Sequence, residues 1–184
     1  MPILSREPDV YPAEIFERAD PGSRWWVAQV RGRQEKRLAR HLRDRRIAYC
    51  LPQREKRARR KARARSSYLP VLPGYVFFRG DPGDRRQAFD SLVVLTVLDV
   101  FDQSRLETEL RDLWRLTRSS LPLEQHPFVE PGQEVRVTDG PFAGFRGTVV
   151  RSRNGSRLVV SLTLLRRSVA AEVDRDAVEP WVEV

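Results

Sequence analysis

The hydrophobic period of this chain changes once, and that change constrains the fold more than any other feature. From residue 25 to residue 118, short β-favouring runs alternate with runs of helical period. Beyond residue 119 the helical period disappears, and alternating or apolar β-type segments follow one another between glycine turns. Helices packed on a sheet and a helix-free β region are different architectures. The pattern therefore predicts a two-domain α+β protein.

The first region reads as an α/β sandwich over residues 24–118. The run from Trp25 to Val30 is apolar and β-favouring, and it ends at Gly32. In the next segment Leu38 and Leu42 lie four residues apart among charges, which is typical of an amphipathic helix. Further strands are expected at 47–51, 75–78 and 92–101, and further helices at 82–91 and from residue 104 onward.

The remaining segments are assigned by their lack of helical period. Residues 1–23 show no sustained period, so we expect a flexible N-terminal arm. Prolines recur between residues 119 and 131, and residues 119–127 are expected to form an interdomain linker. Several short strands between glycine turns in residues 128–184 predict a small β-barrel.

The positive charge is concentrated in one stretch of the chain. The net charge is +9, but residues 31–65 alone carry 16 Lys plus Arg and three acids, which leaves the rest at −4. A localised basic field of this kind points to a polyanionic partner. Arginine dominates the block, and its planar guanidinium suits phosphate contacts, which favours nucleic acid. A merely solvated basic face is the alternative.

Catalytic chemistry finds little support in the sequence. His41 and His126 have no nucleophile pattern beside them, and Cys50, the one cysteine, reads as a buried core residue that cannot form a disulfide within the chain. Glycines at 140, 144 and 147 lack the phosphate-binding loop pattern. We expect no enzyme activity, no cofactor, no metal site and no membrane span, and a cytoplasmic protein.

Two segments of the chain carry recognisable motifs. The first is Trp25-Trp26-Val27-Ala28-Gln29-Val30, followed by Gly32, Glu35 and Leu38 and later by Leu72-Pro73-Gly74-Tyr75-Val76-Phe77. The second, residues 130–149, is similar to the KOW motif almost position for position. There Gly147 permits close approach of another backbone segment. Together the two segments resemble the NusG family of transcription elongation and antitermination factors. The resemblance implies an N-terminal domain with an antiparallel sheet and a C-terminal KOW barrel.

The resemblance also implies partners and contact residues. The N-terminal domain would dock on the clamp helices of RNA polymerase through Trp25, Trp26, Leu72 and Tyr75. The protein would then modulate pausing or termination without making or breaking a bond. A basic loop stands where family members carry a variable hairpin, and it would contact the backbone of upstream DNA or nascent RNA. Its candidate residues are Arg54, Lys56, Arg57, Arg59, Arg60, Lys61, Arg63 and Arg65.

Departures from the family pattern indicate a specialised paralogue. The stretch Leu164-Leu165-Arg166-Arg167 stands where the housekeeping factor has a loop that serves Rho and a small-subunit ribosomal protein. Arg166 replaces a glycine of that loop, so both partnerships stay open. We expect a monomer that associates with the nucleoid. The alternative function is a ribosome-associated or RNA-binding KOW protein acting in translation.

Overall fold

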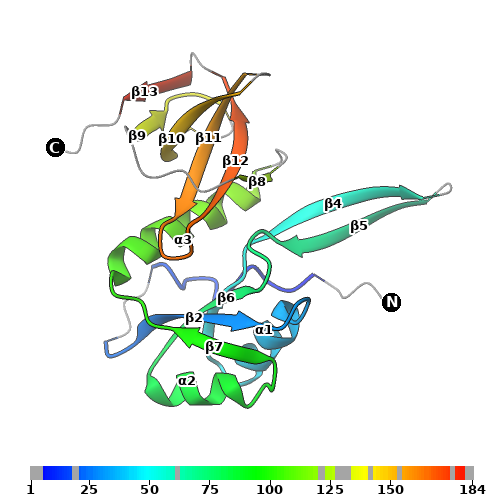
Figure 1. Cartoon of the computed structure of the whole chain (residues 1–184), viewed down its shortest axis with the longest axis vertical. Helices are drawn as coiled ribbons and strands as arrows, with labels where there is room; N and C mark the ends of the chain where they lie inside the picture. The colour runs from blue at the N-terminus through cyan, green and yellow to red at the C-terminus, as the bar shows by residue number, and fades with distance from the viewer. Residues whose placement is uncertain are drawn as a thin grey trace. The chain divides into compact units, whose positions relative to one another are not determined.

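The computed structural model describes residues 6–17, 21–60, 63–119, 123–126, 134–140, 143–152, 155–174 and 177–180. Its elements alternate first and then become all-β (Figure 1), which confirms the α+β class. The chain divides into two compact units, residues 1–103 and 104–184.

A five-stranded antiparallel sheet forms the framework of the first unit. The strand order is β1-β3-β6-β2-β7. The strands are β1 (Val10–Tyr11), β2 (Arg24–Val30), β3 (Ala48–Cys50), β6 (Tyr75–Gly80) and β7 (Val94–Leu98). The central pair β2–β6 runs in register from Arg24 opposite Gly80 to Gln29 opposite Tyr75. The tryptophan-led strand and the Pro-Gly-Tyr strand are therefore neighbours.

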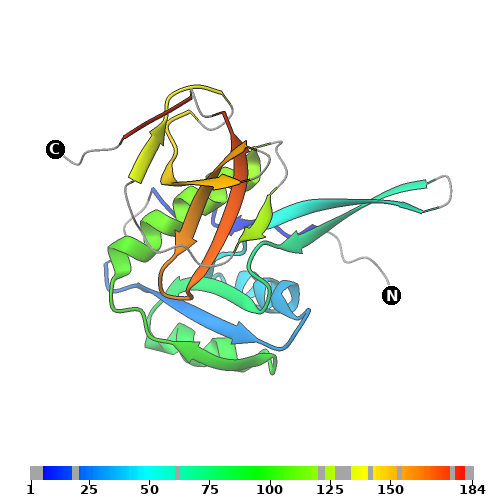
Figure 2. The ribbon, with the colours of Figure 1, turned by 45° about the horizontal axis from the view of Figure 1, so that its top comes forward.

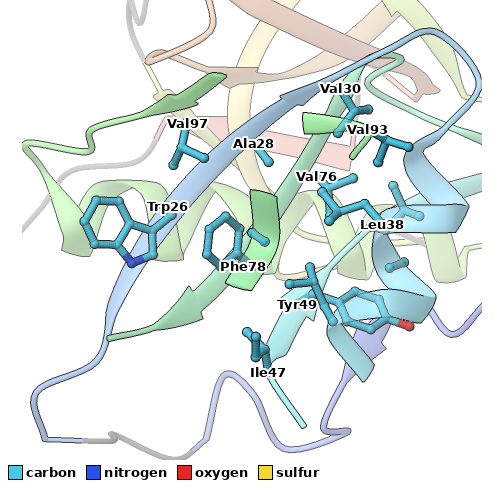
Figure 3. Close-up of a cluster of buried hydrophobic side chains, with 14 residues drawn as sticks. Trp26, Ala28, Val30, Leu38, Ile47, Tyr49, Val76, Phe78, Val93 and Val97 are labelled. Atoms are coloured by element: carbon cyan, nitrogen blue, oxygen red, sulfur yellow. The ribbon is translucent and has the colours of Figure 1, made fainter. Parts of the chain in front are cut away.

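Two helices, α1 (Glu35–Asp44) and α2 (Pro82–Phe89), pack on one face of this sheet. Alternate side chains of a strand point to opposite faces, so Trp26, Ala28 and Val30 lie on the helix side of β2. In Figure 3 these side chains meet those of Val76 and Phe78 on β6 and that of Leu38 on α1. Helix α2 begins with a reciprocal capping box between Asp81 and Asp84, which satisfies backbone donors at its first turn.

The N-terminal segment is more ordered than the sequence suggests. Strand β1 pairs with β3 at the sheet edge, and Glu7 and Asp9 are buried. The Glu7 carboxylate lies 3.3 Å from Arg40 Nε and 3.0 Å from an Arg43 guanidinium nitrogen. These partners are more than thirty residues away, so no local period could reveal them. Residues 7–16 thus differ from the expected loose arm.

Strands β4 (Gln53–Arg60) and β5 (Arg63–Pro70) form a separate two-stranded ribbon. Figures 1 and 2 both show the ribbon extending away from the five-stranded sheet. The basic segment expected as a loop is therefore largely strand, since residues 54–60 pair with residues 63–69. At its base, Gln53 Nε2 donates to the Glu7 carbonyl oxygen at 2.7 Å and to Asp9 Oδ1 at 2.9 Å.

The second unit begins at Ser104, the second residue of α3, and continues as a six-stranded antiparallel sheet. Helix α3 spans Gln103–Arg118 and buries a row of leucines at 106, 110, 113 and 116. The strand order is β13-β9-β10-β11-β12-β8. The strands are β8 (Glu124–His126), β9 (Glu134–Val137), β10 (Arg146–Ser152), β11 (Gly155–Leu162), β12 (Arg167–Val173) and β13 (Val178–Pro180).

Part of the expected linker joins this second sheet. Strand β8 lies within residues 119–127 and pairs with β12, with Gln125 opposite Val169. A strand of three residues is too short to show a period among prolines, which is why the sequence pattern did not predict it. The other proposed domain boundaries remain predictions.

Candidate functional sites

Trp25 and Trp26 are adjacent in β2 and therefore lie on opposite faces of the sheet. Both are buried, with 1% and 5% of their surface exposed. Trp26 Nε1 donates to the Gly80 carbonyl oxygen at 3.1 Å, and the guanidinium carbons of Arg24 and Arg85 lie 4.6 and 5.3 Å from its ring. The structure thus places Trp26 in the core, with two arginine side chains in cation–π contact with its ring.

Trp25 on the opposite face stacks against Phe16, with ring centroids 6.0 Å apart. The side chain of Gln103 bridges its backbone: Trp25 N donates to Oε1, and Nε2 donates to the Trp25 carbonyl oxygen at 3.1 Å. No signal in the sequence marked Gln103 for this role, because its partner lies 78 residues earlier.

The turn that contains Leu72 and Tyr75 is held by three hydrogen bonds. Val30 N donates to the Gly74 carbonyl oxygen at 2.9 Å, and Tyr75 N donates to that of Leu72 at 3.3 Å. Gly74 N donates to Glu35 Oε1 at 2.8 Å. Gly74 has a φ of +87°, a conformation that glycine adopts far more easily than other residues.

This turn presents Tyr75 rather than Leu72. Leu72 is 5% exposed, whereas Tyr75 is only partly buried. Of the four predicted polymerase-contacting residues, Tyr75 has the most accessible side chain. Glu35, which the sequence marked only as part of a motif, is buried beneath the turn and fixes its backbone.

The basic ribbon distributes its charge unevenly. In the β4–β5 register Arg54 faces Leu69, Lys56 faces Ser67, Ala58 faces Arg65 and Arg60 faces Arg63. Residues paired in this way, and every second residue along a strand, share a face. Within the described strands, one face thus holds positions 54, 56, 60, 63 and 65, five of the eight basic residues, and no acid. The other holds Arg57, Arg59 and Glu55, while Lys61 lies outside the described residues.

The predicted partner loop Leu164–Arg167 connects β11 and β12. Arg166 has a φ of +49°, so the position of the family's glycine is indeed left-handed here. The Glu109 carboxylate of α3, in the same unit, accepts Thr163 N at 3.0 Å and Thr163 Oγ1 at 2.7 Å. Leu164, Arg166 and Arg167 are exposed, and Leu165 is half-buried. The connection is therefore anchored at Thr163, the residue before the predicted loop, and the loop itself is exposed at three of its four residues.

Burial dominates the ionisation of two residues in the first unit. Cys50 is free and fully buried, and burial raises the pKa of its thiol well above the usual value. Burial also raises the pKa of Tyr49 to about 12, and its hydroxyl donates to the Pro8 carbonyl oxygen at 3.3 Å. A thiol in this setting is a poor nucleophile.

His41 has a structural role that connects α1 and α2. Its Nε2 lies 2.8 Å from the Gln87 carbonyl oxygen, and Arg45 lies 3.1 Å from its Nδ1. Across the described part of the chain, His, Cys, Asp and Glu side chains form no group of three or more suited to a metal ion. None of the described helices has the length and apolar character of a membrane span.

Comparisons with known proteins agree with this arrangement. The model of the family described as transcription termination factor nusG matches residues 23–109, and a KOW motif model matches residues 131–152. A transcription termination/antitermination protein NusG from Vibrio cholerae is 29% identical over 175 residues, which cover 86% of this chain and 96% of that protein. Its Pasteurella multocida counterpart is 41% identical over 70 residues, 38% of each chain.

A solved structure described as domain interaction in Thermotoga maritima NusG is also similar. It has a TM-score of 0.46 and 16% sequence identity, and the match covers 85% of this chain and 96% of that one.

A tryptophan-led antiparallel sheet domain followed by a KOW segment is the arrangement that these comparisons match. Over these two segments the chain is similar to the NusG family of transcription termination and antitermination factors. The matched proteins are named as transcription termination and antitermination factors.

Proposed function

We propose that the first unit binds RNA polymerase through the Leu72–Tyr75 turn and the neighbouring β2 strand. The observation that carries this proposal is the anchored turn: Gly74 is fixed by Glu35, and the partly exposed Tyr75 follows it. Binding hot spots are enriched in aromatic residues that are already held in place before the partner arrives. Trp25 and Trp26 fill the two faces of the same sheet at the other end of the β2–β6 pair, where Trp26 lies opposite Phe78.

Retention of the full chain on immobilised core RNA polymerase tests this proposal. Tyr75→Ala is expected to weaken binding about ten-fold or more, as loss of an aromatic hot spot does. Tyr68→Ala is the matched control, since Tyr68 is another partly buried tyrosine but lies on the ribbon. Equal binding by both variants would refute the assignment of Tyr75.

The ribbon is proposed to grip nucleic acid through phosphate contacts, with the face that holds positions 60 and 63 toward the backbone. A two-stranded ribbon fits the major groove of a duplex, and the described basic face carries no acid to repel phosphate. Eight residues per strand extend about 27 Å, enough to follow several phosphates. Such contacts add affinity without sequence preference.

A pair of double variants tests this orientation at constant charge loss. Arg60→Ala with Arg63→Ala removes two cations from the proposed binding face, and Arg57→Ala with Arg59→Ala removes two from the other. The first is expected to reduce the slope of log affinity against log salt by about 1.8 for duplex DNA, and the second by much less. If both variants leave the slope at the wild-type value, the ribbon does not bind nucleic acid.

The partner loop supports a specialised member of the family. Arg166 occupies a left-handed position that glycine would adopt without strain, and its charged side chain is exposed. We therefore propose that Rho and the small-subunit ribosomal protein bind this loop weakly. Arg166→Gly should increase the amount of either partner that the full chain captures. An unchanged amount would mean that Arg166 does not weaken binding of either partner. The protein is proposed to act on selected operons, as a monomer in the bacterial cytoplasm.

A further inference from the structure

A pocket of about 550 Å³ lies in the second unit, between the last turn of α3 and the β9–β10 connection. Two aromatic residues, Trp114 and Phe145, and two arginines, Arg115 and Arg118, line it together with the small residues Ala143 and Gly144. Its volume falls in the range of sites that hold a ligand of nucleotide size. The polymerase-docking turn and the basic ribbon contribute no residue to its described lining.

The wall formed by the β9–β10 connection is fixed by backbone hydrogen bonds. Gly144 N donates to the Val137 carbonyl oxygen at 2.7 Å, and Val137 N donates to that of Phe145 at 2.9 Å. Gly144 has a φ of +86°, and a Cβ added at this position would contact nothing within 4 Å. The space where a side chain of residue 144 would lie is therefore open, and a planar ligand can occupy it beside Phe145.

The opposite wall combines an indole with two guanidinium groups. The guanidinium carbon of Arg118 lies 5.1 Å from the centre of the Trp114 ring, which is the geometry of a cation–π contact. Trp114 and Phe145 are half-buried, while Arg115 and Arg118 are exposed. The described lining includes no Asp or Glu, so the charge at the pocket is positive.

This combination matches the chemistry of a nucleotide. Single-stranded nucleic acids are held by aromatic side chains that stack on bases and by cations that follow the backbone. A purely apolar ligand would gain nothing from the arginines, and an acidic peptide would leave the two aromatic faces unused. We propose that the pocket binds one unpaired base of a single-stranded nucleic acid, with flanking phosphates on Arg115 and Arg118.

Fluorescence anisotropy with the full chain and a labelled twelve-nucleotide RNA of mixed, non-pairing sequence tests the proposal. Trp114→Ala is expected to weaken binding about ten-fold without changing the salt slope, because it removes stacking but no charge. Arg118→Gln should reduce the slope by about 0.7, the value for one phosphate contact on a single strand. Arg136→Gln, which changes an exposed arginine of the same unit that does not line the pocket, should leave affinity and slope near the wild-type values.

Further arms identify the ligand and control for folding. Trp114→Phe keeps a stacking ring and should restore most of the affinity that Trp114→Ala loses, and melting curves establish that both variants fold. Comparison with a DNA strand of the same sequence shows whether the protein recognises the ribose hydroxyl. A lower affinity of Trp114→Ala for either strand supports base binding in the pocket. Equal affinity for a duplex, or displacement of the RNA by polyglutamate at matched charge, overturns the proposal.

A crosslinking readout places the base directly. RNA that contains 4-thiouridine should crosslink to peptides that include Trp114 or Phe145, and crosslinks confined to residues 54–65 would overturn the proposal. Polymerase retention of Trp114→Ala should equal that of the wild type. Failure of the pocket and failure of the polymerase proposal are therefore distinguishable.

Discussion

Removal of the Glu35 carboxylate should destabilise the turn that contains Tyr75. Glu35 is buried, and its Oε1 accepts the Gly74 N–H at 2.8 Å. A hydrogen bond to a charged acceptor contributes about 1.5–3 kcal/mol. The same carboxylate lies in the first turn of α1, where interaction with the helix dipole adds about 0.5 kcal/mol. Glu35→Ala should therefore cost about 2–3 kcal/mol.

For a unit of this size, that loss corresponds to a Tm decrease of roughly 10–15 °C by circular dichroism. Glu35→Gln keeps an oxygen acceptor without the charge and should cost about 1 kcal/mol. Asp44→Ala removes an exposed acid from the last residue of the same helix and should stay within about 0.5 kcal/mol of the wild type. If Glu35→Ala and Asp44→Ala have the same Tm, the hydrogen bond to Gly74 contributes nothing to stability and the reasoning fails.

Three further perturbations follow from the packing of each unit. Gly147→Ala would place a Cβ 2.7 Å from a β11 carbonyl oxygen and should lower the free energy of unfolding, measured with denaturant, by about 2 kcal/mol. Gly32→Ala, where an added Cβ meets nothing within 4 Å, should lower it little, and equal effects of the two variants would contradict the steric reason. Tyr49 has its pKa raised in the folded state to about 12, so the stability it contributes is complete below about pH 10 and is lost as the pH rises toward 12. Tyr49→Phe should not show that loss. If the unfolding free energies of the wild type and of Tyr49→Phe change in parallel between about pH 9 and pH 12, Tyr49 is not its cause. Glu7→Gln weakens two ion pairs with arginines that are more than a third exposed, so about 1 kcal/mol is expected, and no change in Tm would mean that solvent screens both pairs.

The sequence predicted those elements whose signal is local. The strand led by Trp25 and the helix around Leu38 and Leu42 appear where period and composition place them. Gly147 indeed lies against another backbone segment, since a Cβ there would meet the Val159 carbonyl oxygen. Hydrophobic period and a missing side chain are properties that a single stretch of sequence carries by itself.

Features that depend on distant partners were not predictable. The burial of Glu7 requires Arg40 and Arg43, and the bridging of the Trp25 backbone requires Gln103. For the candidate sites, the motif identified the turn at Gly74, but the role of Glu35 beneath it follows only from the fold. Contacts between residues far apart in sequence leave no periodic trace, and for that reason this part of the site needed the structure.

The basic ribbon departs from the first sheet between two strands that are themselves neighbours. Strands β3 and β6 pair directly, with Cys50 opposite Phe77, and the ribbon begins and ends between them where Val71 N donates to the Pro52 carbonyl oxygen at 2.9 Å. The pairing of β3 with β6 therefore does not depend on the ribbon. Ribbons of different length and charge can be exchanged at this junction while the core that supports the tyrosine turn stays the same, so the proposed nucleic-acid contacts and the proposed polymerase docking can evolve, or be engineered, independently.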